Sequence, residues 1–266
     1  MTEPTPDPPS DPALLYAPHG EPGRFFCPWA PFTTKFSDLL RWKLAANPHG
    51  PRKAPPAPIV PVVANDGAYL RERGEPASVT WVGHSTFALH DGGDVVLTDP
   101  HWGRRALVPP RLSPPGLPLA AVPEGAFAVL SHNHYDHLDA WTVARLPKGM
   151  RWFVPLGLAR WLRRRIPPEV TGVTELDWWQ SVQAGRWTLT CLPAQHWSNR
   201  TQLDRNATLW CSWLLDNGER RYFFAGDSGY FHGFAEIGRR FPGIDVAMLP
   251  IGAYEPRWFM RYQHMD

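Results

Sequence analysis

The sequence predicts an α/β or α+β sandwich rather than a helical bundle. Short apolar runs rich in β-branched and aromatic residues recur from about residue 78 to the end of the chain. Turns rich in glycine and aspartate separate the first of these runs, which is typical of hairpins in an antiparallel or mixed sheet. Helical patterns are few, and 266 residues suffice for one large domain with a substantial core.

The N-terminal part divides into two segments before the main domain, which we place at residues 76–266. Residues 1–23 are rich in proline and poor in large apolar side chains, so we expect a disordered tail. Residues 24–75 are expected to form an apolar arm, with a short helix at 37–44, followed by an extended proline-rich linker at 48–61.

The main domain is predicted to contain nine strands and three helices. The apolar runs predict strands at 79–82, 87–90, 95–98, 127–130, 152–154, 187–192, 208–215, 222–225 and 246–249. Helical periodicity predicts helices at 139–146, 156–165 and 233–240.

Composition excludes several classes of protein. The formal net charge is only +2, from 27 Lys and Arg against 25 Asp and Glu, so nucleic acid is not expected as a partner. The 3 cysteines lie far apart, which favours reduced thiols over a disulfide framework. No apolar run reaches the roughly 18 residues of a membrane span, and the first residues lack the pattern of a signal peptide. We therefore expect a cytoplasmic protein.

The strongest chemical signal is the segment 131–139, Ser-His-Asn-His-Tyr-Asp-His-Leu-Asp, directly after an apolar strand. Residues two apart on an extended segment point the same way, so His132 and His134 can converge on one metal ion. Where the chain turns toward a helix, Asp136 and His137 can reach a second, adjacent position. Imidazole and carboxylate ligands suit Zn²⁺, and also Fe or Mn.

Two further residues follow the ends of predicted strands. His196 comes shortly after the strand at 187–192, and Asp227 after the strand at 222–225. Ligands gather at this edge of open sheets. Each residue taken alone fits a polar turn as well as a ligand position, whereas the His-rich motif favours ligation for both.

The pattern HxHxDH, with a downstream His and an Asp at a strand end, resembles the metallo-β-lactamase-fold metallohydrolases. The sequence is most similar to their N-acyl-phosphatidylethanolamine-hydrolysing phospholipase D branch, also described as RomA/UlaG-like. This resemblance implies an αββα sandwich, with two mixed sheets flanked by helices. The narrower resemblance is carried by residues 81–86, 97–100, 131–139, 175–179, 193–198, 204–210, 224–230 and 249–260.

The resemblance also implies a site with two Zn²⁺. One ion would bind His132, His134 and His196, the other would bind Asp136 and His137, and Asp227 would bridge them. Catalytic roles are implied for Asp136 at the metals, for Asp99, which would orient a ligand imidazole through its free N–H, and for His264. His264 would contact substrate or protonate the leaving group, although an exposed terminal residue is the simpler alternative.

One departure from the family concerns the second metal. Family members continue past the residues that match 264–266, through a helix and a strand that supplies the last histidine of this position. We therefore expect a chain truncated at its C-terminus, with its C-terminal elements missing, or a second site with fewer protein ligands.

The function implied is phospholipase D-type hydrolysis of N-acyl-phosphatidylethanolamine. A metal-bridging hydroxide would attack phosphorus, N-acylethanolamine would be the leaving group, and phosphatidic acid would be the other product. The alternatives are a lactone or sugar-phosphate hydrolase of the UlaG-like group, or an inactive metal-binding scaffold left by truncation. The partner is thus a phospholipid or small-molecule substrate, and the oligomeric state is left open. Peripheral membrane contact is expected through apolar side chains of the arm, unless these pack on the domain: Trp29, Phe32, Phe36, Leu40 and Trp42.

Overall fold

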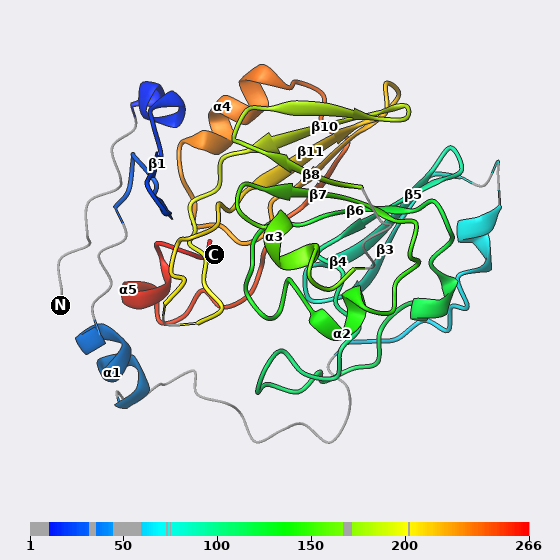
Figure 1. The fold of residues 1–266 in the computed structure, drawn as a ribbon, viewed down its shortest axis with the longest axis horizontal. Helices are drawn as coiled ribbons and strands as arrows, with labels where there is room; N and C mark the ends of the chain where they lie inside the picture. The colour runs from blue at the N-terminus through cyan, green and yellow to red at the C-terminus, as the bar shows by residue number, and fades with distance from the viewer. Residues whose placement is uncertain are drawn as a thin grey trace.

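The computed structural model describes residues 11–31, 36–44, 60–72, 74, 76–166, 172–201 and 203–265. Its main part is a sandwich of two sheets (Figure 1). The first sheet has the order β3 (Ser78–Gly83), β4 (Thr86–Asp91), β5 (Asp94–Thr98), β6 (Phe127–Val129), β7 (Arg151–Pro155) and β8 (Val173–Leu176). The second has the order β13 (Val246–Met248), β12 (Arg221–Phe224), β11 (Ser212–Asp216), β10 (Trp187–Leu192) and β9 (Ser181–Ala184).

Both sheets are mixed. In the first, β3, β4 and β5 pair antiparallel, and β5 to β8 pair parallel. In the second, β9 to β12 pair antiparallel, and β13 joins β12 in parallel. The predicted mixed sheets are confirmed.

Alternation along the strands divides the apolar side chains into two layers. In β12, Phe224 faces the core between the sheets, whereas the preceding Phe223 belongs to a cluster on the outer face. In β6, Val129 faces inward and Ala128 outward. Both faces of each sheet are therefore apolar, which requires a covering layer on the outside.

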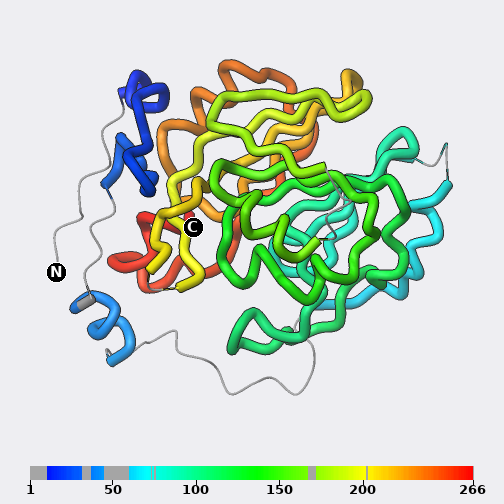
Figure 2. The backbone as a smooth tube through the Cα atoms, in the orientation of Figure 1, coloured from blue at the N-terminus to red at the C-terminus, as the bar shows by residue number. Residues whose placement is uncertain are grey.

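Helices supply that outer layer. Side chains of α2 (Ala140–Val143) and α3 (Ala159–Leu162) join the cluster on the outer face of the first sheet, and those of α4 (Gly233–Arg240) join the cluster on the second. The chain path in Figure 2 shows the resulting layers, and the predicted αββα arrangement is confirmed. α2 and α3 are shorter than the predicted helices. α3 begins only after Gly157, whose φ of +87° is incompatible with a helix.

Two strands of the sandwich were not predicted, and one predicted strand begins too early. β8 and β9 lie at the edges of their sheets, where half-exposed polar residues obscure the alternation. Residues 208–211 belong to no strand, and β11 begins only at Ser212. Leu209, Trp210 and Cys211 are apolar because the core encloses them, and not because they pair with a neighbouring strand.

The prediction of a disordered tail at residues 1–23 is wrong from Asp11 onward. A short 3-10 helix spans Pro12–Tyr16, capped by Asp11, and Leu15 is only 1% exposed. The indole N–H of Trp179 donates to the Leu15 carbonyl at 2.8 Å. Tyr16 also stacks on Trp179, and His19 Nε2 lies 2.7 Å from Asp177 Oδ1, so several contacts hold a segment whose prolines lower the entropy lost on ordering.

The arm is likewise attached to the domain. After β1 (Gly20–Glu21) and β2 (Arg24–Phe25), Trp29 is 0% exposed and donates to Gln195 Oε1 at 3.1 Å, so it cannot contact a membrane. The predicted helix at 37–44 is confirmed as α1 (Phe36–Leu44). Its Trp42 ring stacks on Phe259 of α5 (Arg257–Met260), with ring centres 5.1 Å apart.

Part of the predicted arm and linker lies outside the described residues, namely Phe32 and nearly all of residues 48–61. Short 3-10 helices at Ala68–Arg71 and Leu119–Ala121 lie in the connections between the other elements.

The three cysteines are buried and unpaired, in accord with the predicted thiols. Within the described parts of the chain, every helix is too short or too polar to cross a bilayer.

A buried carboxylate fastens the two sheets at the end of β4. Asp91 accepts hydrogen bonds from the Tyr222 hydroxyl at 2.6 Å and Asn217 Nδ2 at 2.7 Å, and Arg186 lies 2.9 Å away. Burial alone would raise the pKa of Asp91, but the hydrogen bonds from Tyr222 and Asn217 and the charge of Arg220 lower it. The charged form therefore stabilises the fold.

Replacing this carboxylate tests its contribution. Asp91→Asn is expected to lower the free energy of unfolding by about 3 kcal/mol at pH 7, because it leaves buried donors without an acceptor. Because the pKa of Asp91 is lowered on folding, its ionised side chain stabilises the fold at pH values above 3.8, the ordinary pKa of aspartate. This stabilisation disappears as the pH falls through the pKa of the folded state. The difference measured by urea unfolding should therefore shrink in acid. Glu219→Gln, an exposed control, should unfold like the wild type, and equal stability of Asp91→Asn would contradict this account.

Candidate metal centre

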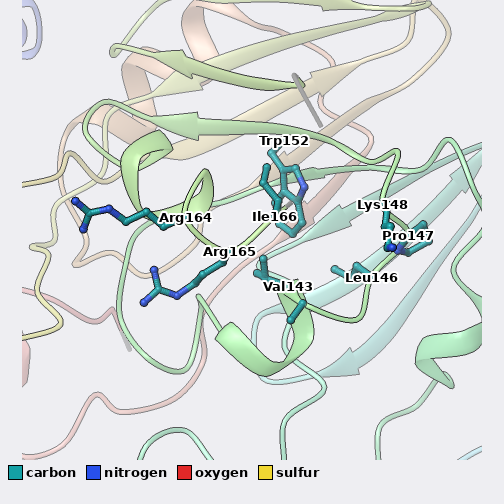
Figure 3. Close-up of a pocket in the computed structure, with 9 residues that line it drawn as sticks. Val143, Leu146, Pro147, Lys148, Trp152, Arg164, Arg165 and Ile166 are labelled. Carbon is teal, nitrogen blue, oxygen red and sulfur yellow. The ribbon is translucent and has the colours of Figure 1, made fainter. Parts of the chain in front are cut away.

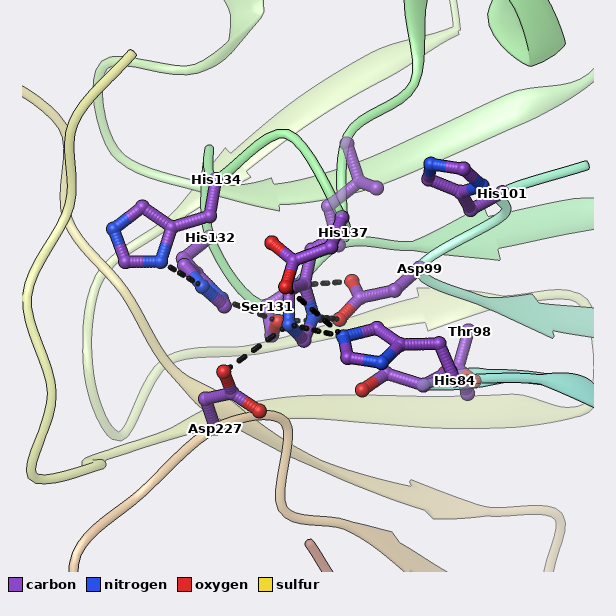
Figure 4. A network of polar contacts seen from close by, with 12 residues as sticks. His84, Thr98, Asp99, His101, Ser131, His132, His134, His137 and Asp227 are labelled. Carbon is purple, nitrogen blue, oxygen red and sulfur yellow. Dashed lines mark hydrogen bonds and ion pairs between the residues drawn. The ribbon is translucent and has the colours of Figure 1, made fainter. Parts of the chain in front are cut away.

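Strand ends from both sheets meet at one edge of the sandwich and carry the predicted site residues. Asp99 follows β5, the segment 131–139 follows β6, and Asp227 follows β12. The turn 83–85 between β3 and β4 reaches the same edge, because Phe87 at the start of β4 pairs with Thr98 at the end of β5. Figure 4 shows these side chains pointing toward one another.

Three imidazoles form the first cluster. His132 Nε2 lies 2.8 Å from His134 Nδ1, and His196 Nε2 lies 3.4 Å from the same atom. The nitrogens of all three are within 4.8 Å of one another, the convergence that a metal ion needs. The structure therefore brings together the three residues assigned to the first ion by the resemblance.

The electrostatics of this cluster suit metal binding. Burial and the neighbouring imidazoles hold the pKa of His132 and of His196 well below the ordinary value, and burial lowers that of His134 to about 4. All three rings are therefore neutral at pH 7, with lone pairs facing one point. Neutral imidazole is the form that ligates a metal, so the donor set fits a divalent ion.

The second cluster contains Asp136 and His137, as predicted, and also His84, which the sequence reasoning did not assign. His84 Nε2 lies 3.2 Å from Asp136 Oδ2 and 3.3 Å from His137 Nε2. Asp227 stands between the clusters, with Oδ2 at 3.2 Å from His137 Nε2 and 3.9 Å from His196 Nε2. A carboxylate in this place can ligate a metal ion at either cluster.

Charge is balanced in the second cluster by its carboxylates. Burial alone would lower the pKa of His137, but the negative charges of Asp227 and Asp136 raise it well above the ordinary value. The charge of His137 in turn lowers the pKa of both carboxyl groups, although burial opposes this. Both aspartates are thus ionised and available as oxygen ligands.

Asp99 holds the two ends of the motif in place. Its side chain is fully buried, and it accepts hydrogen bonds from Ser131 N at 2.6 Å and from Ser131 Oγ. His137 Nδ1 lies 2.7 Å from Asp99 Oδ2, which turns Nε2 toward Asp136 and His84. The structure thus places Asp99 where it can orient a ligand imidazole.

Gly226 allows the Asp227 turn to approach Ser131. Its φ is +60°, and a Cβ atom there would lie 2.5 Å from the Ser131 Cβ. Any other residue would push Asp227 away from the histidines.

Arg200 fixes the loop that carries the histidines, a role with no signal in the sequence. Its Nη1 donates to the carbonyls of Asn133 at 2.9 Å and Leu138 at 2.7 Å, on either side of Asp136. The guanidinium also lies 4.1 Å from the ring centre of Tyr135. Only the folded chain brings this arginine beside the motif.

His264 lies at the border of the site, as predicted. Its Nδ1 is 3.9 Å from Asp227 Oδ2, and its ring centre is 5.5 Å from that of His196. The preceding Gln263 carbonyl lies 3.1 Å from His196 Nδ1, so this part of the chain also orients a cluster residue. The simpler alternative, an exposed terminal side chain, is wrong because His264 is largely buried.

A cleft of about 710 Å³ opens from the two clusters. Polar residues of the two clusters and their border line it, namely His84, His134, Asp136, His196, Asp227 and His264. Its remaining wall is mainly apolar and aromatic: Trp81, Phe87, Trp197, Phe224, Met248, Leu249, Pro250, Ile251 and Ala253. The cleft can therefore receive a substrate with a polar centre and an apolar body.

A second cavity, of about 270 Å³, lies beside α2 and α3 (Figure 3). Its described lining residues include Lys148, Arg164 and Arg165 but no His, Cys, Asp or Glu. This cavity therefore lacks metal ligands among the described residues.

Comparison with known families matches residues 95–266, more than half of the chain, to the family described as "Beta-lactamase superfamily domain". The chain is 42% identical over 202 residues to N-acyl-phosphatidylethanolamine-hydrolyzing phospholipase D 1 of Caenorhabditis elegans, covering 70% of this chain and 57% of that protein. It is 34% identical over 207 residues to the mitochondrial protein of the same description from Saccharomyces cerevisiae, covering 72% and 43%. The chain thus spans about half the length of these relatives.

Solved structures share the fold. A possible metal-dependent hydrolase from Veillonella parvula superposes with a TM-score of 0.53 at 16% identity, covering 64% of this chain and 70% of that chain. An isothiocyanate hydrolase from Delia radicum gut bacteria gives a TM-score of 0.52 at 20% identity, covering 64% and 70%. Together with the family match and the two-sheet sandwich, these likenesses show that the chain belongs to the beta-lactamase superfamily, with the metallo-β-lactamase fold.

Proposed function

We propose that the chain is the metal-binding part of a hydrolase that cleaves N-acyl-phosphatidylethanolamine in the manner of a phospholipase D. Two relatives carry this activity in their names, and the fold is that of metal-dependent hydrolases. Because the chain spans only about half of those relatives, its own activity has to be measured.

The clusters described above would hold two divalent ions, which we propose to be Zn²⁺. His132, His134 and His196 would bind one, Asp136 and His137 the other, and Asp227 both. When bound, such ions lower the pKa of a water molecule and neutralise charge on phosphoryl oxygens.

The residues around the two clusters would orient the metal ligands and bind the substrate. Asp99 keeps the His137 ring turned so that Nε2 faces the site, and Arg200 keeps Asp136 within reach. His264 is placed to contact the phosphate group or to protonate the leaving oxygen, since its ring borders both Asp227 and the cleft.

The lining of the cleft is the observation that supports a lipid substrate. Its apolar wall adjoins its polar lining residues, so a phosphodiester at the metals would have its acyl chains against Phe87, Met248 and Leu249. Burial of such chains contributes roughly 25 cal/mol per Å². A sugar phosphate or other polar substrate would use little of this wall.

Peripheral contact with a membrane is a further part of the proposal. With Trp29 buried, the candidates on the arm are Leu40 and Leu44 of α1, which are 49% and 75% exposed and lie close to Arg41 and Lys43. An amphipathic helix with basic residues suits the surface of an anionic membrane. We propose a cytoplasmic protein that reaches its lipid through this helix.

Metal content tests the first step. The wild-type chain is expected to retain two zinc ions after dialysis, and His134→Ala should lose the first of them together with any hydrolase activity. Elemental analysis gives the ratio of metal to protein. His19→Ala removes an imidazole that bonds Asp177 instead of the cluster, and should leave the metal content unchanged. Full metal content in His134→Ala would contradict the ligand assignment.

Substrate turnover tests the second step. The zinc-loaded chain is expected to release N-acylethanolamine and phosphatidic acid from vesicles that contain N-acyl-phosphatidylethanolamine, as measured by mass spectrometry. A lactone and a sugar phosphate are tested in parallel. Turnover of these alone would replace the lipid proposal by the UlaG-like alternative. Two bound metals without any turnover would favour the inactive scaffold.

The exposed leucines test membrane contact. Leu40→Asp combined with Leu44→Asp should weaken sedimentation with anionic vesicles by roughly tenfold or more, because each leucine loses its burial in the bilayer. Leu203→Asp, at a side chain that is 98% exposed outside α1, is the matched control. Equal sedimentation of the double variant and the control would refute contact through α1.

A further inference from the structure

We propose that His84 is a protein ligand of the second metal position, together with Asp136 and His137. The inference rests on the proposed metal centre and deepens it. His84 reaches this position from the turn between β3 and β4, far along the chain from the His-rich motif.

The distances fit one ion. His84 Nε2 is 3.2 Å from Asp136 Oδ2 and 3.3 Å from His137 Nε2. In a tetrahedral site with bonds of ~2.1 Å, neighbouring ligand atoms lie about 3.4 Å apart. The ligand atoms of His84, Asp136 and His137 all lie within 4.8 Å of one another, as one ion requires.

The hydrogen-bond partners turn the nitrogens of the second cluster toward one point. His137 Nδ1 lies 2.7 Å from Asp99 Oδ2, which directs its Nε2 toward His84 Nε2, 3.3 Å away. One divalent cation at this point would bind both nitrogens and the Asp136 carboxylate at once.

The backbone at His84 is held in an unfavourable conformation. Its φ is +50°, a region that costs energy for residues other than glycine. The Trp81 indole N–H donates to the His84 carbonyl at 2.7 Å and holds the turn. The side chain is 49% exposed, so burial does not explain why an imidazole is kept here. Such strain is typical of functional sites.

Metal titration of the wild-type chain and its variants tests the inference without recourse to activity. Metal-free protein is titrated with Zn²⁺ by calorimetry and with Co²⁺ by visible absorption. His84→Gly removes the imidazole and tolerates the positive φ. His84→Gln keeps an N–H donor for Asp136 but offers no imidazole nitrogen. Ser85→Ala, in the same turn, is the matched control.

The wild type and Ser85→Ala are expected to bind two ions. Both His84 variants should bind the first ion normally and the second more than about 100-fold more weakly, a larger loss than an outer hydrogen-bond partner causes. The Co²⁺ absorption of the second ion should change in step, because a nitrogen ligand is lost.

The outcomes separate the two proposals. If His84→Gln binds the second ion as the wild type does while His84→Gly does not, His84 only orients Asp136 and the inference is wrong. If both variants bind two ions tightly, the inference fails and the proposed function stands. If the wild type binds no metal, the proposed function itself fails, and the inference with it.

Discussion

The carboxylate of Asp99 is the interaction on which the rest of the site depends. It is fully buried between the ends of β5 and β6, where a charge without partners would cost several kcal/mol. Ser131 supplies two of its hydrogen bonds, and His137 lies against the other side. The need to satisfy one buried charge therefore fixes the start of the His-rich segment and the direction of one of its imidazoles.

Gly226 and Arg200 complete the geometry of the site by different means. Gly226 itself lies against Ser131, which no larger residue would allow, and so lets the second sheet bring the turn with Asp227 to the site. Arg200 bonds the backbone of the His-rich loop on both sides of Asp136. The clusters thus face each other because both sheets end at the same edge, and the backbone there is bonded rather than free to rearrange.

Much of this could be predicted from the sequence, because the signals are local. Strands such as β10 and β12 are rich in apolar residues and almost continuously buried, and the motif from His132 to His137 places its donors within a few residues. The missing parts depend on contacts between distant residues. β8 and β9 are edge strands with mixed exposure, and Leu15 and Trp29 are buried only by partners far along the chain. His84 lay in a recognised motif, but its role appears only when the sheet brings it to Asp136.

The attachment of the N-terminal segment has a consequence for the order of folding. Leu15 and Trp29 bond residues that follow them by 164 and 166 positions. Contacts of such high sequence separation form slowly, because the closure entropy of the intervening chain must be overcome first. The segment with Leu15 and Trp29 therefore cannot make these contacts until Trp179 and Gln195 have been synthesised. Since His196 adjoins Gln195, the hydrogen bond from Trp29 couples the ordering of this segment to that of the loop that carries His196.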